Sequence, residues 1–392
     1  MRVLDLFAGC GGLSAGLLSA GCEVVGAIEK DKWAAETYRH NHQGIPLIEA
    51  DVSELTTEFL KDSFADKVEM IAGGPPCQGF SVSGKRQFGE FNQTNNMVLE
   101  FMRAVAALEP NFVLFENVAG FSSAALDESR GALPYLKSEL QELGYHTDTR
   151  VLQAADFGVP QFRRRLFLFA SKVPLNKSPF PIESHNANGT VGKKKHLSVL
   201  EAVGDLPPIQ AREGQDGMQP YTVRDTTWFQ RLMREGSVGV FNHEAMKHSK
   251  RLVERFKTIP EGGSGYDIGR NQDNNSAVTV YKSNNQRLVR TLPSLCITAN
   301  FQSNYVHPLF DRNLTAREGA RIQTFPDRFI FCGRRTLMSK KLLLAEGRHE
   351  ENYLSQYNQI GNAVPPKLAE ALGISVLEAI AEPALLRARI RA

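Results

Sequence analysis

A single cysteine in a proline-stiffened loop is the feature of this chain that most directly suggests chemistry. Residues 73–81 read Gly-Gly-Pro-Pro-Cys-Gln-Gly-Phe-Ser and follow a short, mostly apolar run at 68–72 that predicts a buried strand. The two prolines restrict the backbone and present Cys77 at the carboxyl end of that strand. Covalent catalysis requires a thiolate held in one place, so the pattern predicts a nucleophile, with an unreactive cysteine in a stiff turn as the alternative.

Three other segments place polar groups at the ends of predicted strands. Glu116 follows one apolar run, and Arg163 and Arg165 precede another. Near the start, residues 5–12 read Asp-Leu-Phe-Ala-Gly-Cys-Gly-Gly and join a strand to a helix, and such glycines let the backbone approach a ligand closely. The four segments together supply a nucleophile, an acid, paired guanidinium groups and a cofactor turn.

The elements that must position these groups alternate along the first 170 residues. Short apolar runs separated by helical patterns predict a mostly parallel sheet that is covered by helices on both faces. The predicted strands are 3–7, 23–28, 45–49, 68–72, 112–116, 146–152 and 165–170, and the predicted helices lie near 12–20, 32–41, 94–108 and 131–143. After about residue 172 the chain becomes rich in Gly, Asn, Ser and Pro, which indicates a smaller, loop-rich domain of short strands.

Two helices are predicted near the C-terminus. Thr315 and Glu318 fit a capping box that begins a short helix to about Gln323. A second helical pattern covers about 367–380 and follows the polar segment 357–366.

Charge and composition narrow the functional class. Residues 171–350 contain 27 Lys and Arg against 17 Asp and Glu, a net charge of +10, whereas the whole chain of 392 residues carries only +3. This basic part suits a phosphate backbone, although charge alone also fits a solvated surface, and Lys193–Lys195 is interpreted as a solvated loop. Five cysteines without a Cys-x-x-Cys pair argue against a disulfide framework or a metal site and favour a cytoplasmic location. We expect neither a membrane span nor a signal peptide.

The ordered motifs resemble those of the cytosine carbon-5 DNA methyltransferases of bacterial restriction–modification type. The resemblance covers residues 5–170 and about 290–366. It implies an α/β fold, namely the Rossmann-like sheet of S-adenosylmethionine-dependent methyltransferases, with a second, smaller loop-rich target recognition domain. The implied catalytic domain covers 1–178 and is completed by 355–392, which return to it, and the target recognition domain covers 179–354. Double-stranded DNA would be bound by a monomer, and the small size suits the modification half of a pair with a restriction endonuclease.

The resemblance also implies the cofactor, S-adenosylmethionine, with S-adenosylhomocysteine as the product. Residues 7–11 would bind its methionine end, Glu29 its ribose, and Asp51 with Val52 its adenine. Lys30 stands where some relatives have an aromatic residue, so the side chain that covers the adenine stays open. The full set of cofactor-binding residues would be Phe7, Ala8, Gly9, Gly11, Glu29, Asp51, Val52, Pro76 and Asn362.

The same resemblance assigns the reaction to four side chains. Cys77 would add to carbon 6 of a cytosine, and Glu116 would hydrogen-bond or protonate ring nitrogen 3. Arg165 would contact the exocyclic oxygen at carbon 2, and Arg163 would organise the site. Because a duplex hides both faces of the base, the cytosine must be flipped out of the stack.

Two further segments are expected to contact DNA. The polar segment from Ser81 to about 96, with Lys85 and Arg86, is interpreted as a loop that closes over the flipped base. Residues 171–289 carry no family motif and are interpreted as the part that chooses the sequence. Their candidates for pairing with guanine edges are Arg224, Arg231, Arg251, Arg255 and Arg270, whereas Tyr221, Trp228, Phe241 and Tyr266 are expected in the small core.

Three alternatives compete with this interpretation. A tRNA cytosine methyltransferase of the same superfamily usually has Pro-Pro-Cys-Gln-Pro-Phe, whereas Gly79 here follows the DNA-enzyme form. A catalytically inactive DNA-binding relative would not need Cys77, Glu116, Arg163 and Arg165 together. An NAD-dependent dehydrogenase is disfavoured because Gly-x-Gly-Gly is not the dinucleotide pattern Gly-x-Gly-x-x-Gly.

Overall fold

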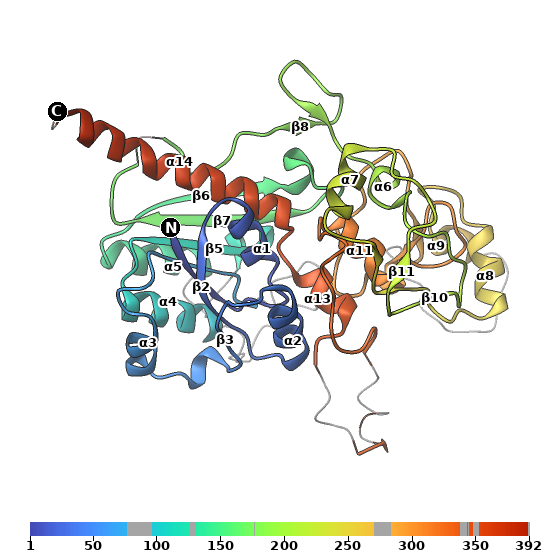
Figure 1. Cartoon of the computed structure of the whole chain (residues 1–392), viewed down its shortest axis with the longest axis horizontal. Helices are drawn as coiled ribbons and strands as arrows, with labels where there is room; N and C mark the ends of the chain where they lie inside the picture. Colours follow the sequence, from blue (N-terminus) through green and yellow to red (C-terminus); the bar gives the residue numbers. More distant parts are fainter. Residues whose placement is uncertain are drawn as a thin grey trace. The chain divides into compact units, whose positions relative to one another are not determined.

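The computed structural model describes residues 1–76, 96–124, 131–175, 177–269, 284–337, 343, 345–347 and 353–390. The chain forms two compact units (Figure 1). Unit 1 consists of Met1–Gln153, Arg164–Glu183 and Pro366–Ala392, and unit 2 consists of Ala154–Arg163 and Ser184–Pro365. These bounds differ from the expected ones, because residues 154–163 belong to unit 2 and the last change of unit falls after residue 365.

Unit 1 is built on a seven-stranded sheet of order β3-β2-β1-β4-β5-β7-β6. The pairs from β3 to β5 are parallel, and β7 is antiparallel to both of its neighbours. The strands are β1 (Arg2–Leu6), β2 (Glu23–Ile28), β3 (Leu47–Ile48), β4 (Met70–Gly73), β5 (Phe112–Val118), β6 (His146–Gln153) and β7 (Arg164–Ser171). The mostly parallel α/β sheet expected from the alternating pattern is therefore confirmed.

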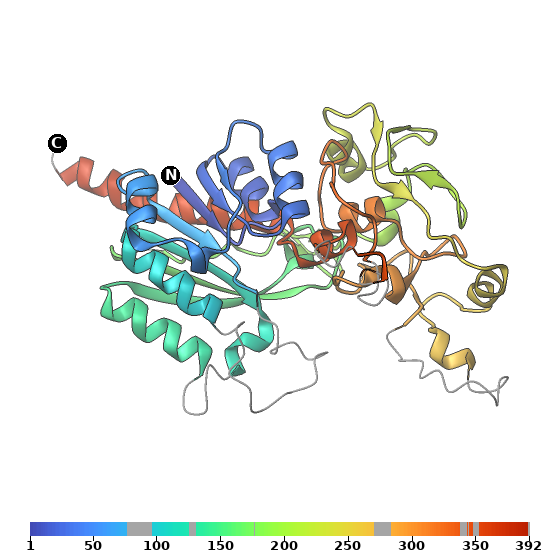
Figure 2. The ribbon, with the colours of Figure 1, turned by 90° about the horizontal axis from the view of Figure 1, so that it is seen from below.

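Helices cover both faces of this sheet (Figure 2). One face carries α3, α4 and α5, whose apolar side chains join the strands in one buried cluster. The other face carries α1 and α14. The helices of unit 1 are α1 (Gly12–Ser19), α2 (Lys32–Asn41), α3 (Thr57–Phe64), α4 (Asn96–Leu108), α5 (Ala132–Glu142) and α14 (Pro366–Ile390), with short 3-10 helices at Val52–Glu54 and Ala119–Ser123.

Two details of these helices bear on the sequence predictions. The α14 helix packs on α1, where a Cβ on Gly16 would lie 2.4 Å from both Ala369 Cβ and Pro366 O. The C-terminal segment thus returns to the first domain, as expected. The α3 helix is absent from the sequence prediction, because its only buried side chains are Leu60 and Phe64, too few for a clear periodic pattern.

Unit 2 has little regular structure, as its composition indicated. Its strands pair in twos, as β8 with β9, β10 with β13, β11 with β12, and β14 with β15. They are β8 (His185–Asn186), β9 (Lys194–Lys195), β10 (Gly214–Gln215), β11 (Gln219–Pro220), β12 (Gly239–Val240), β13 (His243–Glu244), β14 (Gln286–Arg287) and β15 (Tyr305–Val306). The helices are α6 (Val199–Val203), α7 (Trp228–Arg234), α8 (Lys250–Lys257), α9 (Gly265–Gly269), α10 (Phe301–Asn304), α11 (Ala316–Ile322) and α13 (Gln356–Asn362), with a 3-10 helix at Ala154–Phe157.

Buried ion pairs around α11 organise the core of unit 2. The predicted capping box is present, since Thr315 Oγ1 accepts from the Glu318 amide and the Glu318 carboxylate accepts from the Thr315 amide. The same carboxylate receives both Arg312 Nη1 and Nη2, at 2.8 and 2.7 Å. Arg321 bonds to Asp327 at 2.6 Å in the same way. These polar contacts hold a unit whose apolar runs are short. No helix among the described residues has the length and apolar character that crossing a bilayer requires.

Candidate active site

The turn after β1 forms an open cradle. Phe7, Gly9 and Gly11 all have φ between 56° and 91°, a left-handed conformation in which an L side chain is strained. A Cβ on Gly9 would meet no described atom within 4 Å, so space stays open beside this backbone. At Gly11 the neighbour is instead His42, whose Nε2 lies 3.1 Å from Gly11 O. The turn is thus closed on the side of His42 and open beside Gly9, where a ligand has room.

Glu29 ties the cradle to the end of β2. One of its carboxylate oxygens accepts from the Gly9 amide at 2.8 Å, and the other accepts from the Asp31 amide at 2.7 Å. The side chain is buried, and this burial raises the pKa of Glu29. Each oxygen keeps a second lone pair, so the carboxylate remains able to accept hydrogen bonds from a ligand.

A second buried acid lies beneath the turn, and the sequence pattern does not single it out. Asp5 Oδ2 accepts from Ser14 Oγ at 2.6 Å, and Ser14 Oγ lies 2.9 Å from Tyr38 Oη. Burial raises the pKa of Asp5 to about 7, and its Oδ1 is buried without a partner in the described structure. An open cradle, a buried acceptor and an orphaned carboxylate oxygen fit a polar cofactor with donor groups.

Asp51 caps a short helix, in addition to its expected contact with adenine. Its Oδ1 accepts from the amide and the hydroxyl of Ser53, which caps the 3-10 helix Val52–Glu54. Its Oδ2 accepts from Lys30 Nζ at 2.9 Å. Burial works against the charged form, but these hydrogen bonds outweigh it and hold the pKa of Asp51 below its ordinary value. Lys30 therefore lies beside the expected adenine-binding acid.

An acid and a guanidinium group meet where β5 and β7 pair. Arg165 Nε lies 3.2 Å from Glu116 Oε1, and the two side chains are only 15 and 11% exposed. The strand register pairs Arg165 of β7 with Val118 of β5, and Glu116 lies two residues before Val118 on β5. The structure thus brings together two of the four residues that the sequence assigned to the reaction.

The end of β4 lies against the same acid. A Cβ on Gly74 would be 2.8 Å from Glu116 Oε2, so only glycine leaves room for the carboxylate in this position. Asn117 Nδ2 donates to Pro75 O at 3.2 Å and holds the start of the next loop against β5. Pro76 is partly exposed. Cys77, Ser81, Lys85 and Arg86 follow in the sequence and lie outside the described residues.

Arg163 belongs to unit 2 and is fully buried there. Its guanidinium group donates to the carbonyl oxygens of Ile297, Gly361 and Ala363 at 2.7 to 3.1 Å. These contacts tie two distant segments of unit 2 together, so the role open to Arg163 is to position backbone. Asn362, the last residue of α13, is exposed.

The candidate DNA-contacting arginines divide into two kinds. Arg224, Arg231 and Arg251 are exposed. Arg255 instead donates to Gly265 O at 2.9 Å and holds α8 on the following turn. Arg270 lies outside the described residues.

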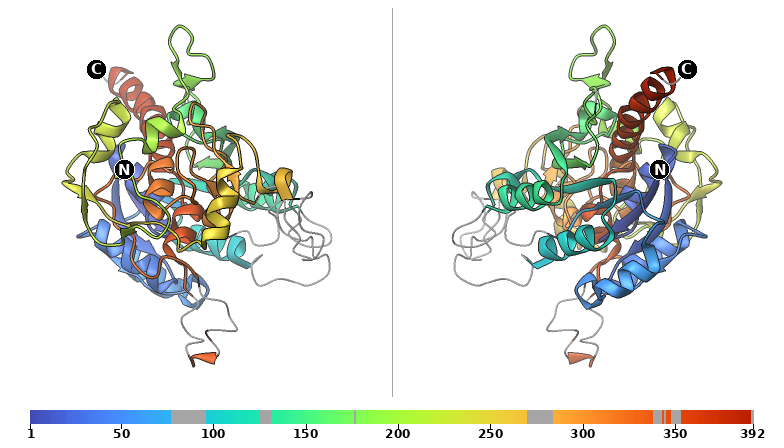
Figure 3. Two further views of the ribbon diagram at one scale, coloured as in Figure 1. Left: turned by 90° about the vertical axis from the view of Figure 1, so that its right-hand side faces the viewer. Right: turned by 90° about the vertical axis from the view of Figure 1, so that its left-hand side faces the viewer.

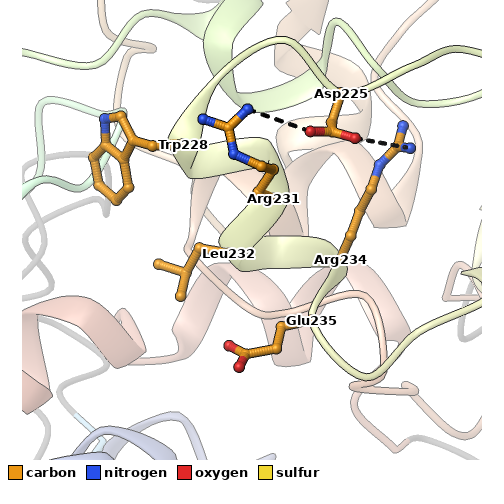
Figure 4. Close-up of a pocket in the computed structure, with 6 residues that line it drawn as sticks. All are labelled: Asp225, Trp228, Arg231, Leu232, Arg234 and Glu235. Carbon is orange, nitrogen blue, oxygen red and sulfur yellow. Dashed lines mark hydrogen bonds and ion pairs between the residues drawn. The ribbon is translucent and has the colours of Figure 1, made fainter.

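The expectation that Trp228 lies in the small core is wrong. Its side chain is 40% exposed, because the buried face of α7 is formed by Phe229, Gln230 and Met233. Trp228 is the first residue of α7, and Figure 4 shows its ring pointing away from the helix.

Comparisons with known proteins agree on one family. The model of the C-5 cytosine-specific DNA methylase family matches residues 1–378. The Type II methyltransferase M.DdeI of Desulfomicrobium norvegicum is 42% identical over 381 residues, which cover 95% of this chain and 87% of that protein. The Type II methyltransferase M1.HphI of Haemophilus parahaemolyticus is 31% identical, with 96% and 87% covered.

Solved structures extend the likeness to the fold. A protein described as a DNA modification methyltransferase encoded within a prophage of E. coli superposes with a TM-score of 0.73 at 25% identity, covering 97% of this chain and 99% of that one. The Dnmt2 methyltransferase of S. pombe superposes with a TM-score of 0.56 over 97% and 99% of the two chains. At 17% identity, this second likeness concerns the fold alone.

Proposed function

Because the chain belongs to the C-5 cytosine-specific DNA methylase family, we propose that it transfers the methyl group of S-adenosylmethionine to a cytosine flipped out of a specific double-stranded DNA sequence. The chain is a DNA (cytosine-5) methyltransferase, and the resemblance seen in its motifs is confirmed. The cofactor, the flipped base and the covalent intermediate are the proposed parts. The observation that carries them is the buried contact of Glu116 with Arg165 beside the strand end that leads to Cys77.

The reaction needs a nucleophile because carbon 5 of cytosine is itself a poor one. The Cys77 thiolate adds to carbon 6, and the ring electrons then move to carbon 5, which becomes able to accept a methyl group. S-adenosylmethionine, when bound, would supply that methyl group from its positively charged sulfur and leave as S-adenosylhomocysteine. Loss of the carbon-5 proton to a base then expels the Cys77 thiolate and restores the aromatic ring.

Glu116 and Arg165 keep negative charge from accumulating on the ring. A protonated Glu116 donates to ring nitrogen 3, and the Arg165 guanidinium donates to the oxygen at carbon 2. Arg165 is oriented by its contact with Glu116 and by a 2.8 Å hydrogen bond from its Nη1 to Arg164 O. Two groups that are already fixed lose little entropy when the base arrives.

Cofactor binding is proposed for the cradle and the residues around it. The turn at 7–11 would receive the methionine end, and Glu29 would accept from the ribose hydroxyls. Asp51 and Val52 would face the adenine, with Pro76 and Asn362 completing the site. The open space beside Gly9, the second lone pairs of Glu29 and the orphaned Asp5 oxygen support this proposal.

Unit 2 is proposed to choose the DNA sequence. Its exposed arginines and its basic composition suit a duplex. Arg163 would act by holding the backbone at Gly361 and Ala363, and thus as a positioning residue. In the cytoplasm of a bacterial host, a restriction endonuclease of the same specificity would be the functional counterpart.

Bisulfite sequencing of DNA from a host that expresses the protein tests the proposed function. We expect protected cytosines within one short sequence, and no protection with Cys77→Ala. A duplex that carries 5-fluorocytosine should trap the wild type covalently, because fluorine blocks the final elimination. Cys22→Ala is the matched control, since Cys22 lies buried at the turn between α1 and β2 and should not affect trapping. Adduct formation by Cys77→Ala would refute the assignment of the nucleophile.

A further inference from the structure

Two basic segments of unit 2 have no part in the proposed chemistry. The lysine loop, defined as residues 185–196, comprises β8, β9 and the turn between them, and it contains three lysines and no Asp or Glu. Residues 224–235, which include α7, contain three arginines and two acids. Figure 3 shows the lysine loop in green as a projection from the rest of unit 2. These segments give unit 2 a region of net positive charge.

Internal hydrogen bonds hold the backbone of the lysine loop. The Asn186 side chain accepts from the Gly189 amide and donates to Thr190 Oγ1, both at 2.7 Å. At the base of the loop, His196 Nε2 lies 2.8 Å from Asp156 Oδ1. These hydrogen bonds restrict the backbone of the loop, so the loop loses less backbone entropy when it binds a partner.

Lys194 joins this loop to α7. Its Nζ lies 5.0 Å from the centroid of the exposed Trp228 ring, within cation–π range. Along α7, Arg231 is 61% exposed, and its Nη1 lies 3.5 Å from Asp225 Oδ2. Figure 4 shows Trp228 and Arg231 on the same helix, where they help to line an open hollow of about 570 Å³. Lys194 of the loop therefore lies beside the indole of α7, and Trp228 and Arg231 line one hollow.

Among the described residues, three cations of these two segments, Lys194, Lys195 and Arg224, are not paired with a carboxylate, whereas Arg234 is held by Asp205 at 2.6 Å. Asp225, one of the two acids, is shared between Arg231 and Arg234 at 3.5 and 4.0 Å. Exposed cations without acidic neighbours attract a polyanion, and release of its counterions favours binding.

We propose that the lysine loop and the exposed side of α7 form a sequence-independent contact with the phosphate backbone of the DNA substrate. The inference rests on the proposed function, since it adds a contact to the same substrate. Lysine ammonium groups are point charges that suit phosphates and lack the planar fork that reads base edges. The contact adds affinity for any duplex. It assigns Arg231 to phosphates in place of the guanine edge expected from the sequence, so other residues of unit 2 choose the sequence.

A triple variant tests the contact against a control with the same change of charge. Lys193→Gln, Lys194→Gln and Lys195→Gln are combined in the full chain. The control combines Lys32→Gln, Lys61→Gln and Lys67→Gln, three lysines of unit 1. The affinity of each protein is measured on two duplexes, one with and one without the methylated sequence, from about 0.05 to 0.3 M salt.

The expected result is a uniform loss. The slope of log affinity against log salt should shrink by about 2–3 for the loop variant, with an affinity loss of roughly 10²-fold near 0.1 M on both duplexes. Arg231→Gln should reduce the slope by about 1. The control should stay close to the wild type on both duplexes.

Three outcomes would overturn the inference. Equal slopes for the two triple variants would mean that the loop does not contact DNA. A loss confined to the duplex with the methylated sequence would mean that the loop reads bases. Unchanged DNA binding together with lost binding of an acidic protein would assign the surface to that partner. Trapping of the wild type by the 5-fluorocytosine duplex distinguishes failure of the proposed function from failure of this contact. If the wild type is not trapped, the proposed function fails. If it is trapped but the two triple variants have equal slopes, only the phosphate contact is refuted.

Discussion

Replacing Gly74 by alanine should slow methyl transfer strongly while leaving the fold nearly intact. The added Cβ would lie 2.8 Å from Glu116 Oε2, and the next described atoms are Glu116 O at 3.5 Å and Glu116 Cβ at 3.8 Å. Only the end of the side chain is therefore too close, and it can rotate away without movement of the backbone. The cost falls on the position of the carboxylate and hence on the reaction.

The size of the effect follows from this geometry. The carboxylate oxygen must move by about 0.6 Å to reach an ordinary contact of 3.4 Å. Misplacement of a reacting group by about 1 Å costs on the order of 10²-fold in rate, so we expect a loss of about 10- to 10²-fold. The ceiling is the whole general-acid contribution, about 10²–10⁴-fold. A Glu116 side chain held away from its preferred rotamer would lower the free energy of unfolding by only about 0.5–1.5 kcal/mol.

Single-turnover methyl transfer from a preformed complex is the appropriate assay, with DNA affinity and thermal unfolding measured on the same protein. Gly217→Ala is the matched control, because a Cβ there would have its nearest described neighbour at 4.0 Å. In a Glu116→Gln background, Gly74→Ala should have almost no further effect, since both changes act on one carboxylate. A wild-type rate for Gly74→Ala, or additive losses in the double variant, would refute the reasoning.

Three further predictions follow from the site and from unit 2. Glu116→Gln should lower single-turnover methyl transfer by about 10²–10⁴-fold with DNA affinity little changed, and an unaltered rate would exclude Glu116 as the acid. Burial lowers the pKa of His243 to about 4 and that of His307 to about 3, so their stabilising contribution is full above pH 6.5 and is lost as the pH falls toward 4. Urea unfolding should show a loss of up to about 1.4 kcal/mol per pH unit for each histidine. Asp5, with its pKa raised to about 7, works in the opposite direction, so the histidine part is isolated by comparing the wild type with His243→Gln, and the same pH dependence in both proteins would contradict this. Replacement of 180–289 by the matching segment of a relative with different specificity should move methylation to the relative's site, as bisulfite sequencing would reveal, and an active chimera that keeps the original site would place sequence choice elsewhere.

Local pattern in the amino-acid sequence determines much of this protein. The sequence pattern predicts the seven strands of unit 1, and the central ones most clearly, because the core of a parallel sheet demands consecutive buried side chains, whereas the edge strand β6 is exposed or half-buried over most of its length. The capping box at Thr315 and Glu318 is predictable for a similar reason, since a cap depends only on neighbours three residues apart. The ordered motifs also indicate the family, which the comparisons confirm over residues 1–378.

Contacts between distant residues cannot be predicted in this way. The asparagine at 117 and the carbonyl at Pro75 are 42 positions apart, and only strand pairing brings β4 and β5 together to place Gly74 against Glu116. Arg163 has the sequence context of a candidate catalytic group, yet its partners at Ile297 and Gly361 lie 134 and 198 positions away.

The exposure of Trp228 and the burial of Asp5 belong to the same class of result. Residue type predicts an aromatic core residue at 228 and gives the acid at 5 no special role, whereas the fold leaves the indole partly in solvent and encloses the carboxylate. Secondary structure follows from periodicity within one segment where that pattern is clear, as in the strands of unit 1, and is missed where it is weak, as in α3. Burial, pairing and pKa depend on which segments meet, and this is set by the cooperative packing of the whole unit.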